Sequence, residues 1–222
     1  MTNSPCLPKE NLRFGAWYSY LPNWLDCLQA ESLYQQLCAD LEWEVRTIFA
    51  LGKPVQQPRL MAWGGALEYR YSSQTLPVRE LHPALIELSQ QLSVLCSTPF
   101  NHVVLNRYRD GSDHMSSHAD NEPELGNNPV IAALSLGSTR TFVMQPKAKR
   151  GRRKHTVKLS LEDGSLLVMG GRMQRSWRHS VPKMPGSGPR INITFRQLMG
   201  APGWRPPEWD AYPDSHGRGT QR

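Results

Sequence analysis

Two histidines and an aspartate have the types and spacing of metal ligands. His118-Ala119-Asp120 forms an H-x-D pair, and His179 follows much later in the chain. On a strand or at its edge, residues i and i+2 point to the same side, so one short segment can supply an imidazole and a carboxylate. Two His and one carboxylate form the set that holds non-haem Fe(II) and leaves its other positions open. An H-x-D pair alone is weak evidence, since polar residues in a surface loop give the same pattern.

A segment with two arginines follows the second histidine. Its polar residues Arg190, Asn192, Thr194 and Arg196 alternate with Ile191, Ile193 and Phe195. Such a strand presents one face to packing and the other to a polar cavity. Burying two arginines destabilises the fold unless an anion lies between them. A dicarboxylic acid bound by bidentate guanidinium groups would supply that anion. Asn106 and Tyr108 share a face by the same spacing and could add neutral hydrogen bonds. The alternative is a solvent-facing sheet edge.

Short alternating segments fill the chain from about residue 100 onward. We expect strands at 102–109, 129–137, 140–145, 156–162, 165–170, 175–181 and 190–198. Turn signals such as Asp110-Gly111 and Asp163-Gly164 separate them. Strands at this spacing, without helical stretches between them, predict a sandwich, jelly roll or barrel.

Helical patterns precede these strands. Leucines recur on one face within 23–43 (Leu33, Leu37, Leu41) and again after His82-Pro83 (Leu85, Leu88, Leu92, Leu95). Such stripes predict two amphipathic helices. Residues 1–22 indicate an extended arm, and residues 47–77, rich in Gly, Pro and aromatics, indicate loops and short strands. Trp63 and Trp177 are expected in the core.

The charge balance favours a polyanionic partner. Lys and Arg number 26 against 19 Asp and Glu, which gives a net charge of +7. Many basic proteins nevertheless bind no nucleic acid specifically. The chain has no apolar run of the roughly 18 residues that span a bilayer, its first residues lack signal-peptide order, and its four cysteines are scattered. We expect an intracellular protein, cytoplasmic or nuclear in a eukaryote, with no membrane partner.

Taken in order, N-x-Y, H-x-D, the later His and R-x-N-x-T-F-R resemble the AlkB family of alkylation-repair dioxygenases. The resemblance covers roughly residues 45–198, including the segments PRLMAWGG, GSLLVMGG and PRINITFR. It is strongest to members that repair duplex DNA or single-stranded nucleic acid in animals. It implies a mainly β fold with flanking helices (α+β), built on a double-stranded β-helix (jelly-roll) core with an N-terminal nucleotide-recognition lid.

The resemblance also implies a role for each matching residue. His118, Asp120 and His179 would bind Fe(II). Arg190 would pair with the distal carboxylate of 2-oxoglutarate, and that co-substrate's site would be completed by Asn106, Tyr108, Asn192 and Arg196. Tyr71 would stack on the flipped, damaged base opposite the His118 ring, while Tyr69 would contact its phosphate or sugar side. One departure concerns Asn121, which is followed by Glu122: the family commonly has an acid at the first position, so the preferred lesion stays open.

Two further segments fit a nucleic-acid partner. Leu51 lies where relatives that act on duplexes carry a wedge hairpin, and it could fill the gap left by a flipped base. A buried loop anchor is an equal alternative. Residues 147–154 hold six basic residues, among them Lys149, Arg150, Arg152 and Arg153. A solvated turn seldom needs that density, so we expect phosphate contacts there.

The implied organisation is a lid with helices over 1–99, the core over 100–199 and a mobile tail over 200–222, acting as a monomer. The implied reaction hydroxylates the alkyl group of bases such as 1-methyladenine or 3-methylcytosine at the expense of 2-oxoglutarate and O2. It releases aldehyde, succinate and CO2, and the target nucleotide must be flipped out of the stack. The substrate would be DNA, with RNA left open. The alternatives are an oxygenase of the same chemistry acting on a protein or small molecule, and a nucleic-acid-binding module without catalysis.

Overall fold

A large antiparallel sheet forms the centre of the protein. The computed structural model describes residues 7–200 except 51–52, 72–73 and 149–154. The strands of this major sheet lie in the order β1 (Glu10–Leu12), β2 (Ala16–Leu21), β12 (Leu166–Gly171), β9 (Ile131–Gly137), β14 (Arg190–Arg196), β7 (His102–Tyr108), β4 (Lys53–Gly65) and β3 (Glu44–Ala50). Four of the seven strands expected after residue 100 lie in this sheet, and the other three lie in a second sheet, all within two residues of the expected bounds.

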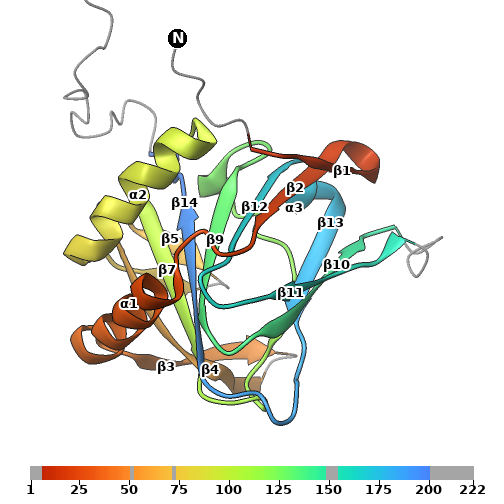
Figure 1. The fold of residues 1–222 in the computed structure, drawn as a ribbon. Helices are drawn as coiled ribbons and strands as arrows, with labels where there is room; N and C mark the ends of the chain where they lie inside the picture. The colour runs from red at the N-terminus through yellow and green to blue at the C-terminus, as the bar shows by residue number, and fades with distance from the viewer. Residues whose placement is uncertain (1–6, 51–52, 72–73, 149–154, 201–222) are drawn as a thin grey trace, which may run out of the picture.

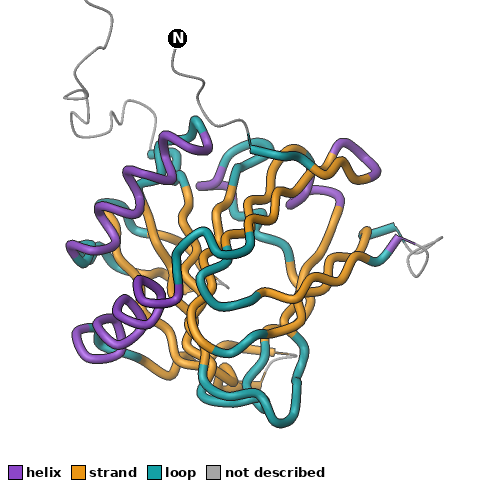
Figure 2. The backbone as a smooth tube through the Cα atoms, viewed as in Figure 1, coloured by secondary structure: helices purple, strands orange, loops and turns teal. Residues whose placement is uncertain are grey.

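A smaller sheet packs against one face of the major sheet. It consists of β11 (Val157–Leu161), β10 (Arg140–Pro146), β13 (Trp177–Val181) and β8 (Met115–His118). Figures 1 and 2 show these strands together on the side away from the helices. Apolar side chains from both sheets, such as Ile131, Met169, Phe142 and Trp177, form one buried cluster between them. Alternation puts these residues inside, and the resulting jelly-roll core confirms the expected fold class.

Two helices cover the opposite face of the major sheet (Figure 1). Helix α1 (Cys27–Asp40) begins with a capping box formed by Asp26 and Gln29, and α2 (Pro83–Cys96) begins with proline in its first turn. Leu33, Leu37, Leu85, Leu88 and Leu92 of the predicted stripes are buried in the core between helices and sheet, each contributing about 1.5–3 kcal/mol. Leu41 and Leu95 are partly buried against it. Among the described residues, every helix falls short of the length and apolarity needed to cross a bilayer.

The short elements lie around the two sheets. They are the strand pair β5 (Tyr69–Tyr71) and β6 (Gln74–Leu76), the single-turn helix α3 (Met173–Ser176), and the 3-10 turns η1 (Arg13–Gly15) and η2 (Pro123–Leu125).

The region before residue 66 contains more strand than its composition indicates. The expected arm includes β2, which pairs with β12 from Leu21↔Leu166 to Ala16↔Gly171. Likewise β3 and the long strand β4 form a hairpin on the edge of the major sheet. Pro54 and Pro58 precede Leu60, where the pairing of β4 with β7 begins, so neither removes a hydrogen bond from the interior of the sheet.

Strand β14 lies in the interior of the major sheet, between β9 and β7. Its register with β7 places Arg190 opposite Tyr108, Asn192 opposite Asn106 and Arg196 opposite His102. Directly opposite residues project to the same face, so the polar side chains of the two strands share one face of the sheet.

Candidate metal and co-substrate site

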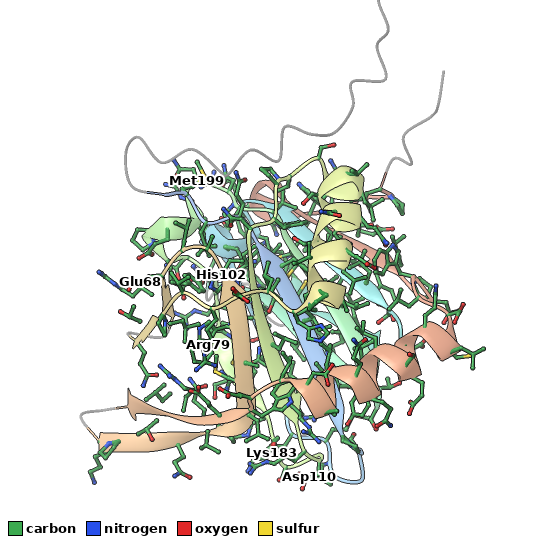
Figure 3. All side chains as sticks on the ribbon, turned by 90° about the vertical axis from the view of Figure 1, so that its left-hand side faces the viewer. Glu68, Arg79, His102, Asp110, Lys183 and Met199 are labelled. Carbon is green, nitrogen blue, oxygen red and sulfur yellow. The ribbon has the colours of Figure 1, made fainter. Side chains whose placement is uncertain are left out.

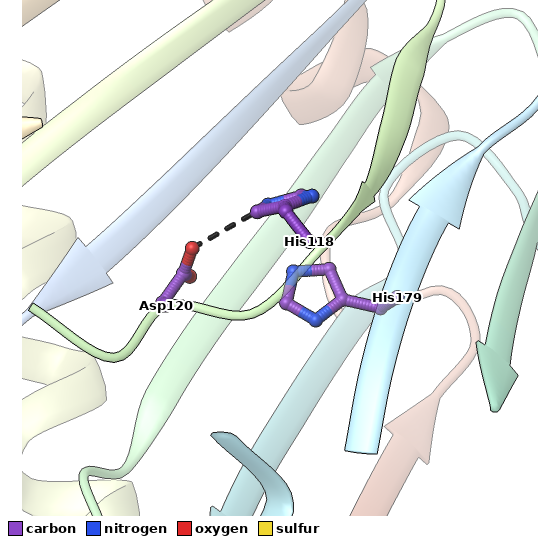
Figure 4. A group of neighbouring side chains, drawn as sticks. All are labelled: His118, Asp120 and His179. Carbon is purple, nitrogen blue, oxygen red and sulfur yellow. Dashed lines mark ion pairs between the residues drawn. The ribbon is translucent and has the colours of Figure 1, made fainter. Parts of the chain in front are cut away.

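His118, Asp120 and His179 converge on one point. His118 ends β8, Asp120 follows it, and His179 comes from β13, which pairs with β8 at His118↔His179. One ligand atom from each residue lies within 4.8 Å of the other two. Figure 4 shows the three side chains pointing toward one another. The spacing argument therefore predicted the grouping correctly.

Hydrogen bonds and burial prepare these groups to bind a cation. The ring nitrogen Nδ1 of His118 lies 2.9 Å from the carbonyl of Ser116, so it carries the proton and leaves the Nε2 lone pair available. Burial lowers the pKa of His179 to about 3, which keeps that imidazole neutral. Burial opposes ionisation of Asp120, but Arg196 and the two imidazoles outweigh it and hold its pKa well below the usual range. Two neutral imidazoles and one anionic carboxylate are a donor set that fits Fe(II).

Asp120 is held on two sides. Its Oδ2 accepts a hydrogen bond from Arg196 Nη2 at 3.1 Å, and both side chains are buried. Its backbone N–H donates to Gln174 Oε1 at 3.0 Å, and Gln174 belongs to α3, just before β13. Its Oδ1 lies 3.4 Å from His118 Nε2 and makes no hydrogen bond within the described structure. The second oxygen is thus left for a metal ion.

Arg190 is fully buried at the other end of β14. Its Nη2 donates to two neutral acceptors, Ser135 Oγ at 2.9 Å and Asn192 Oδ1 at 3.0 Å. Its Nε and Nη1 have no acceptor within the described structure, and the Tyr108 ring lies 5.3 Å away. Burial lowers the pKa of Arg190 to about 10, although Tyr108 partly opposes the shift. A buried cation with spare donors and only neutral partners fits an incoming carboxylate.

One pocket of about 420 Å³ contacts these groups. Its polar lining includes the metal ligands together with Asn106, Tyr108, Asn192, Thr194 and Arg196, whereas its apolar lining is Met115, Ala133, Phe142, Met169 and Val181. The expected co-substrate residues therefore lie together, with Arg190 buried behind Tyr108 and Asn192. An apolar wall beside the metal ligands limits water there and strengthens the electrostatic interactions inside.

Comparisons with known proteins agree with this geometry. The family model described as the 2OG-Fe(II) oxygenase superfamily matches residues 18–196. Human DNA oxidative demethylase ALKBH2 is 33% identical over 86% of this chain and 83% of its own length. The chain belongs to the AlkB family of 2OG-Fe(II) oxygenases. Bovine alpha-ketoglutarate-dependent dioxygenase alkB homolog 3 is 41% identical over 82% of this chain. The match spans 66% of that relative's length. The structure of OsALKBH1 shares the fold, with a TM-score of 0.61 at 18% identity over 85% of this chain and all of the other.

The residues expected to contact the nucleic acid occupy different environments. Tyr69 in β5 is fully buried: its ring lies edge-on to His102 at 5.1 Å and beneath the Arg196 guanidinium at 5.6 Å. Glu122 is partly buried near it, and burial together with the charge of Asp120 raises the pKa of Glu122. Asn121 is exposed and lines a second pocket. Tyr71 is the last residue of β5, and its side chain lies outside the described part, as do residues Leu51, Lys149, Arg150, Arg152 and Arg153.

Several residues of this AlkB-type site were not anticipated. Arg59 is buried on β4 and donates from Nε to Asn106 Oδ1 at 2.6 Å, so it fixes the orientation of that amide. Arg140 is also buried, with its guanidinium 5.4 Å from Tyr108 and bonded to backbone carbonyls of Asp113 and Pro182. Alternation of Gln57, Arg59 and Met61 was the available signal for Arg59, but the prolines and glycines around it favoured a loop.

Proposed function

We propose that this protein is an Fe(II)- and 2-oxoglutarate-dependent oxidative demethylase of N-alkylated bases in DNA, such as 1-methyladenine and 3-methylcytosine. The observation that carries the proposal is one pocket lined by the His118–Asp120–His179 ligand set together with Tyr108 and Asn192. The buried Arg190 lies against Tyr108 and Asn192 and has donors without an acceptor among the described residues. The names of the relatives, DNA oxidative demethylase among them, support this choice over a protein or small-molecule substrate. Whether RNA also serves as substrate is part of the test below.

Fe(II) would be held by the three ligands, and 2-oxoglutarate would lie between the metal and Arg190. When bound, the metal and co-substrate supply the oxidising equivalent that hydroxylates the alkyl carbon, with 2-oxoglutarate and O2 converted to succinate and CO2. Arg190 orients the distal carboxylate through its spare donors, while Asn106, Tyr108 and Asn192 border the same chamber. Arg196 keeps Asp120 ionised and oriented toward the metal.

The damaged nucleotide would enter from the lid side. Because the target carbon lies inside the base stack, the nucleotide must be flipped out at a cost of a few kcal/mol. Tyr71 would stack on the base, and Glu122 with Asn121 would face its polar edge. Tyr69 is fully buried, so its contact with the phosphate or sugar side requires the β5–β6 segment to move. That segment meets the 3-10 turn η2 through an Arg70–Glu124 ion pair of 4.0 Å, which is weak enough to open.

The remaining contacts would lie at the edges of the substrate. Leu51 would fill the gap left in a duplex by the flipped base, and residues 149–153 would contact phosphates of the opposite strand. We also propose that the protein acts as a monomer inside the cell, where its DNA substrate is found.

A demethylation assay tests the function. Oligonucleotides with a single 1-methyladenine or 3-methylcytosine, as single- and double-stranded DNA and as RNA, are incubated with Fe(II), 2-oxoglutarate and air. Restored base and succinate should appear in equal amounts, and neither should appear without 2-oxoglutarate. Succinate formation that no methylated nucleic acid stimulates would contradict the proposal and favour a different substrate class.

A further inference from the structure

A second pocket adjoins the iron pocket from outside. Its lining is mostly polar: Asp120, Asn121, Gly126, Asn127, Asn128, Pro129, Lys147, Gln174 and Arg175. The proposed chemistry uses Asp120 and Asn121 but gives no role to the other residues that line this cavity. Asp120 lines both pockets, so the second pocket directly adjoins one of the three metal ligands.

The second pocket has a positive balance of charge. Lys147 and Arg175 line it, and Asp120 is its acidic lining residue, with a charge already paired with Arg196. Lys147 is held in place because its ammonium donates to the carbonyl of Gln174 at 2.9 Å and its backbone N–H donates to that of Ser176 at 2.8 Å. Burial and the neighbouring charge of Arg178 lower the pKa of Lys147, as expected where cations gather. These charges favour an anionic ligand.

A buried donor in the wall of the pocket points to the same kind of ligand. Gln174 is 1% exposed, and its Oε1 accepts the backbone N–H of Asp120. Because that N–H must face an oxygen, the orientation of the amide is fixed, and Nε2 is the group left over. Nε2 has no hydrogen-bond acceptor within the described structure. Buried amide donors are seldom left unsatisfied, so an acceptor from outside the chain is expected.

We propose that this second pocket binds a backbone phosphate next to the flipped nucleotide. This proposal rests on the proposed function. A nucleotide whose base lies in the iron pocket must place its sugar and phosphates outside that pocket, and the second pocket is the neighbouring cavity because Asp120 lines both. Arg175 and Lys147 hold the phosphate oxygens electrostatically, and Gln174 Nε2 donates to one of them. The site fixes the position of the strand without reading the base.

The test removes the charge of one DNA phosphate at a time. Single-stranded oligonucleotides carry one 1-methyladenine and one neutral methylphosphonate linkage, placed successively on each side of the lesion. Their Kd for the full-length protein, loaded with Fe(II) and 2-oxoglutarate with O2 excluded, is measured by fluorescence anisotropy. At one linkage next to the lesion, the wild type should lose about tenfold in affinity, the usual size of a charge-assisted contact.

Variants of Arg175 test whether this residue is responsible for the loss of affinity at that linkage. Arg175→Gln should bind the unmodified strand about tenfold more weakly and lose its sensitivity at that linkage alone, whereas Arg175→Lys should keep most of it. The matched control is Lys183→Gln, which makes the same charge change. Lys183 is exposed beyond the opposite end of β13 and lies near Asp110 (Figure 3). It should leave the dependence on linkage position unchanged.

Three results would overturn the inference. In the first, Arg175→Gln and the methylphosphonate weaken binding independently of each other. In the second, no linkage near the lesion matters. In the third, inorganic phosphate stabilises the wild type but not Arg175→Gln, and the position of the methylphosphonate has no effect on Kd. That result would mean that the pocket binds a free anion instead of the strand. Demethylation by the wild type, followed in parallel, tests the proposed function separately, because the phosphate contact is measured by binding without turnover.

Discussion

The two ends of strand β14 carry the same residue type in opposite electrostatic situations. At one end, Arg196 forms a buried ion pair with Asp120 at 3.1 Å. At the other, Arg190 is fully buried with only neutral hydrogen-bond acceptors among the described residues. Among the described residues, the Arg196 guanidinium has a carboxylate as its counter-charge, and the Arg190 guanidinium has none.

This difference predicts that Arg196 contributes mainly to the stability of the folded protein and Arg190 mainly to the binding of an anionic ligand. A buried pair is strongly destabilised when one partner is removed, since the other is left charged and desolvated. A buried cation without a counter-ion is already costly in the folded protein, and a ligand that supplies the anion recovers that cost. Under the proposed function, we therefore expect Arg196 to maintain the metal site and Arg190 to bind the co-substrate.

The largest expected effect comes from removing the metal ligands. His118→Ala, Asp120→Ala or His179→Ala should abolish turnover, because each removes one of the three donors. Asp120→Ala should also destabilise the chelator-treated protein by about 3–5 kcal/mol, since Arg196 loses its partner. Succinate formation and urea unfolding measure the two effects. His114→Ala is the matched control and should retain activity. Near-normal turnover in Asp120→Ala would refute the ligand assignment.

Replacing each arginine by methionine compares the two ends directly. Arg196→Met leaves Asp120 buried and unpaired, so we expect a loss of about 3–5 kcal/mol in the free energy of unfolding. Arg190→Met removes an uncompensated charge and keeps an apolar stem of similar length, so its stability should be nearly unchanged or higher. The measurement is urea unfolding without metal or 2-oxoglutarate. Equal losses in the two variants would remove the distinction between the ends.

A conservative change at Arg190 tests its readiness for a carboxylate. Arg190→Lys keeps the charge but loses the planar fork, so KM for 2-oxoglutarate should rise about tenfold or more, equivalent to ~1.4 kcal/mol, while Kd for DNA stays the same. Arg140→Lys is the matched control: Arg140 lies beside the same Tyr108 ring but donates to backbone carbonyls. An unchanged KM in Arg190→Lys would move the distal carboxylate to another residue.

The smallest effect is expected at His102, opposite Arg196. Burial and then the charge of Arg196 lower the pKa of His102 to about 3, and neither ring nitrogen has a hydrogen-bond partner in the described structure. Between pH 6.5 and about 3, His102 is protonated in the unfolded chain but not in the folded protein. This residue therefore lowers the free energy of unfolding as the pH falls. His102→Phe should change stability by less than about 1 kcal/mol at pH 7 and weaken the acid dependence. Unfolding curves at several pH values test this; an unaltered acid dependence would contradict it.

Sequence patterns predicted the strands after residue 100 and the placement of His118 and Asp120 on one side because these depend on local periodicity. His179 was grouped with them by the order of the motifs and the family resemblance. Alternation along 190–196 put its polar residues on one face, whatever the neighbouring strands were. The ion pair of Arg196 with Asp120 and the hydrogen bond from Arg59 to Asn106 were not predictable in this way. Both depend on the register of strands that are distant in the chain. The composition of residues 47–77 predicted loops and short strands rather than the long strand β4. Its prolines lie before the part of the strand that pairs with β7, which cannot be seen from the sequence.

The central position of β14 also has a consequence for synthesis on the ribosome. Residues 190–196 are the last strand of the described chain, yet they fill the space between β9 and β7. While the nascent chain still lacks them, β7 and β9 expose edges without a partner, and neither arginine can reach its place. The eight-stranded sheet and the co-substrate site are thus completed together, by the last strand to emerge. A chain truncated before residue 190 should aggregate rather than persist as an inactive iron protein.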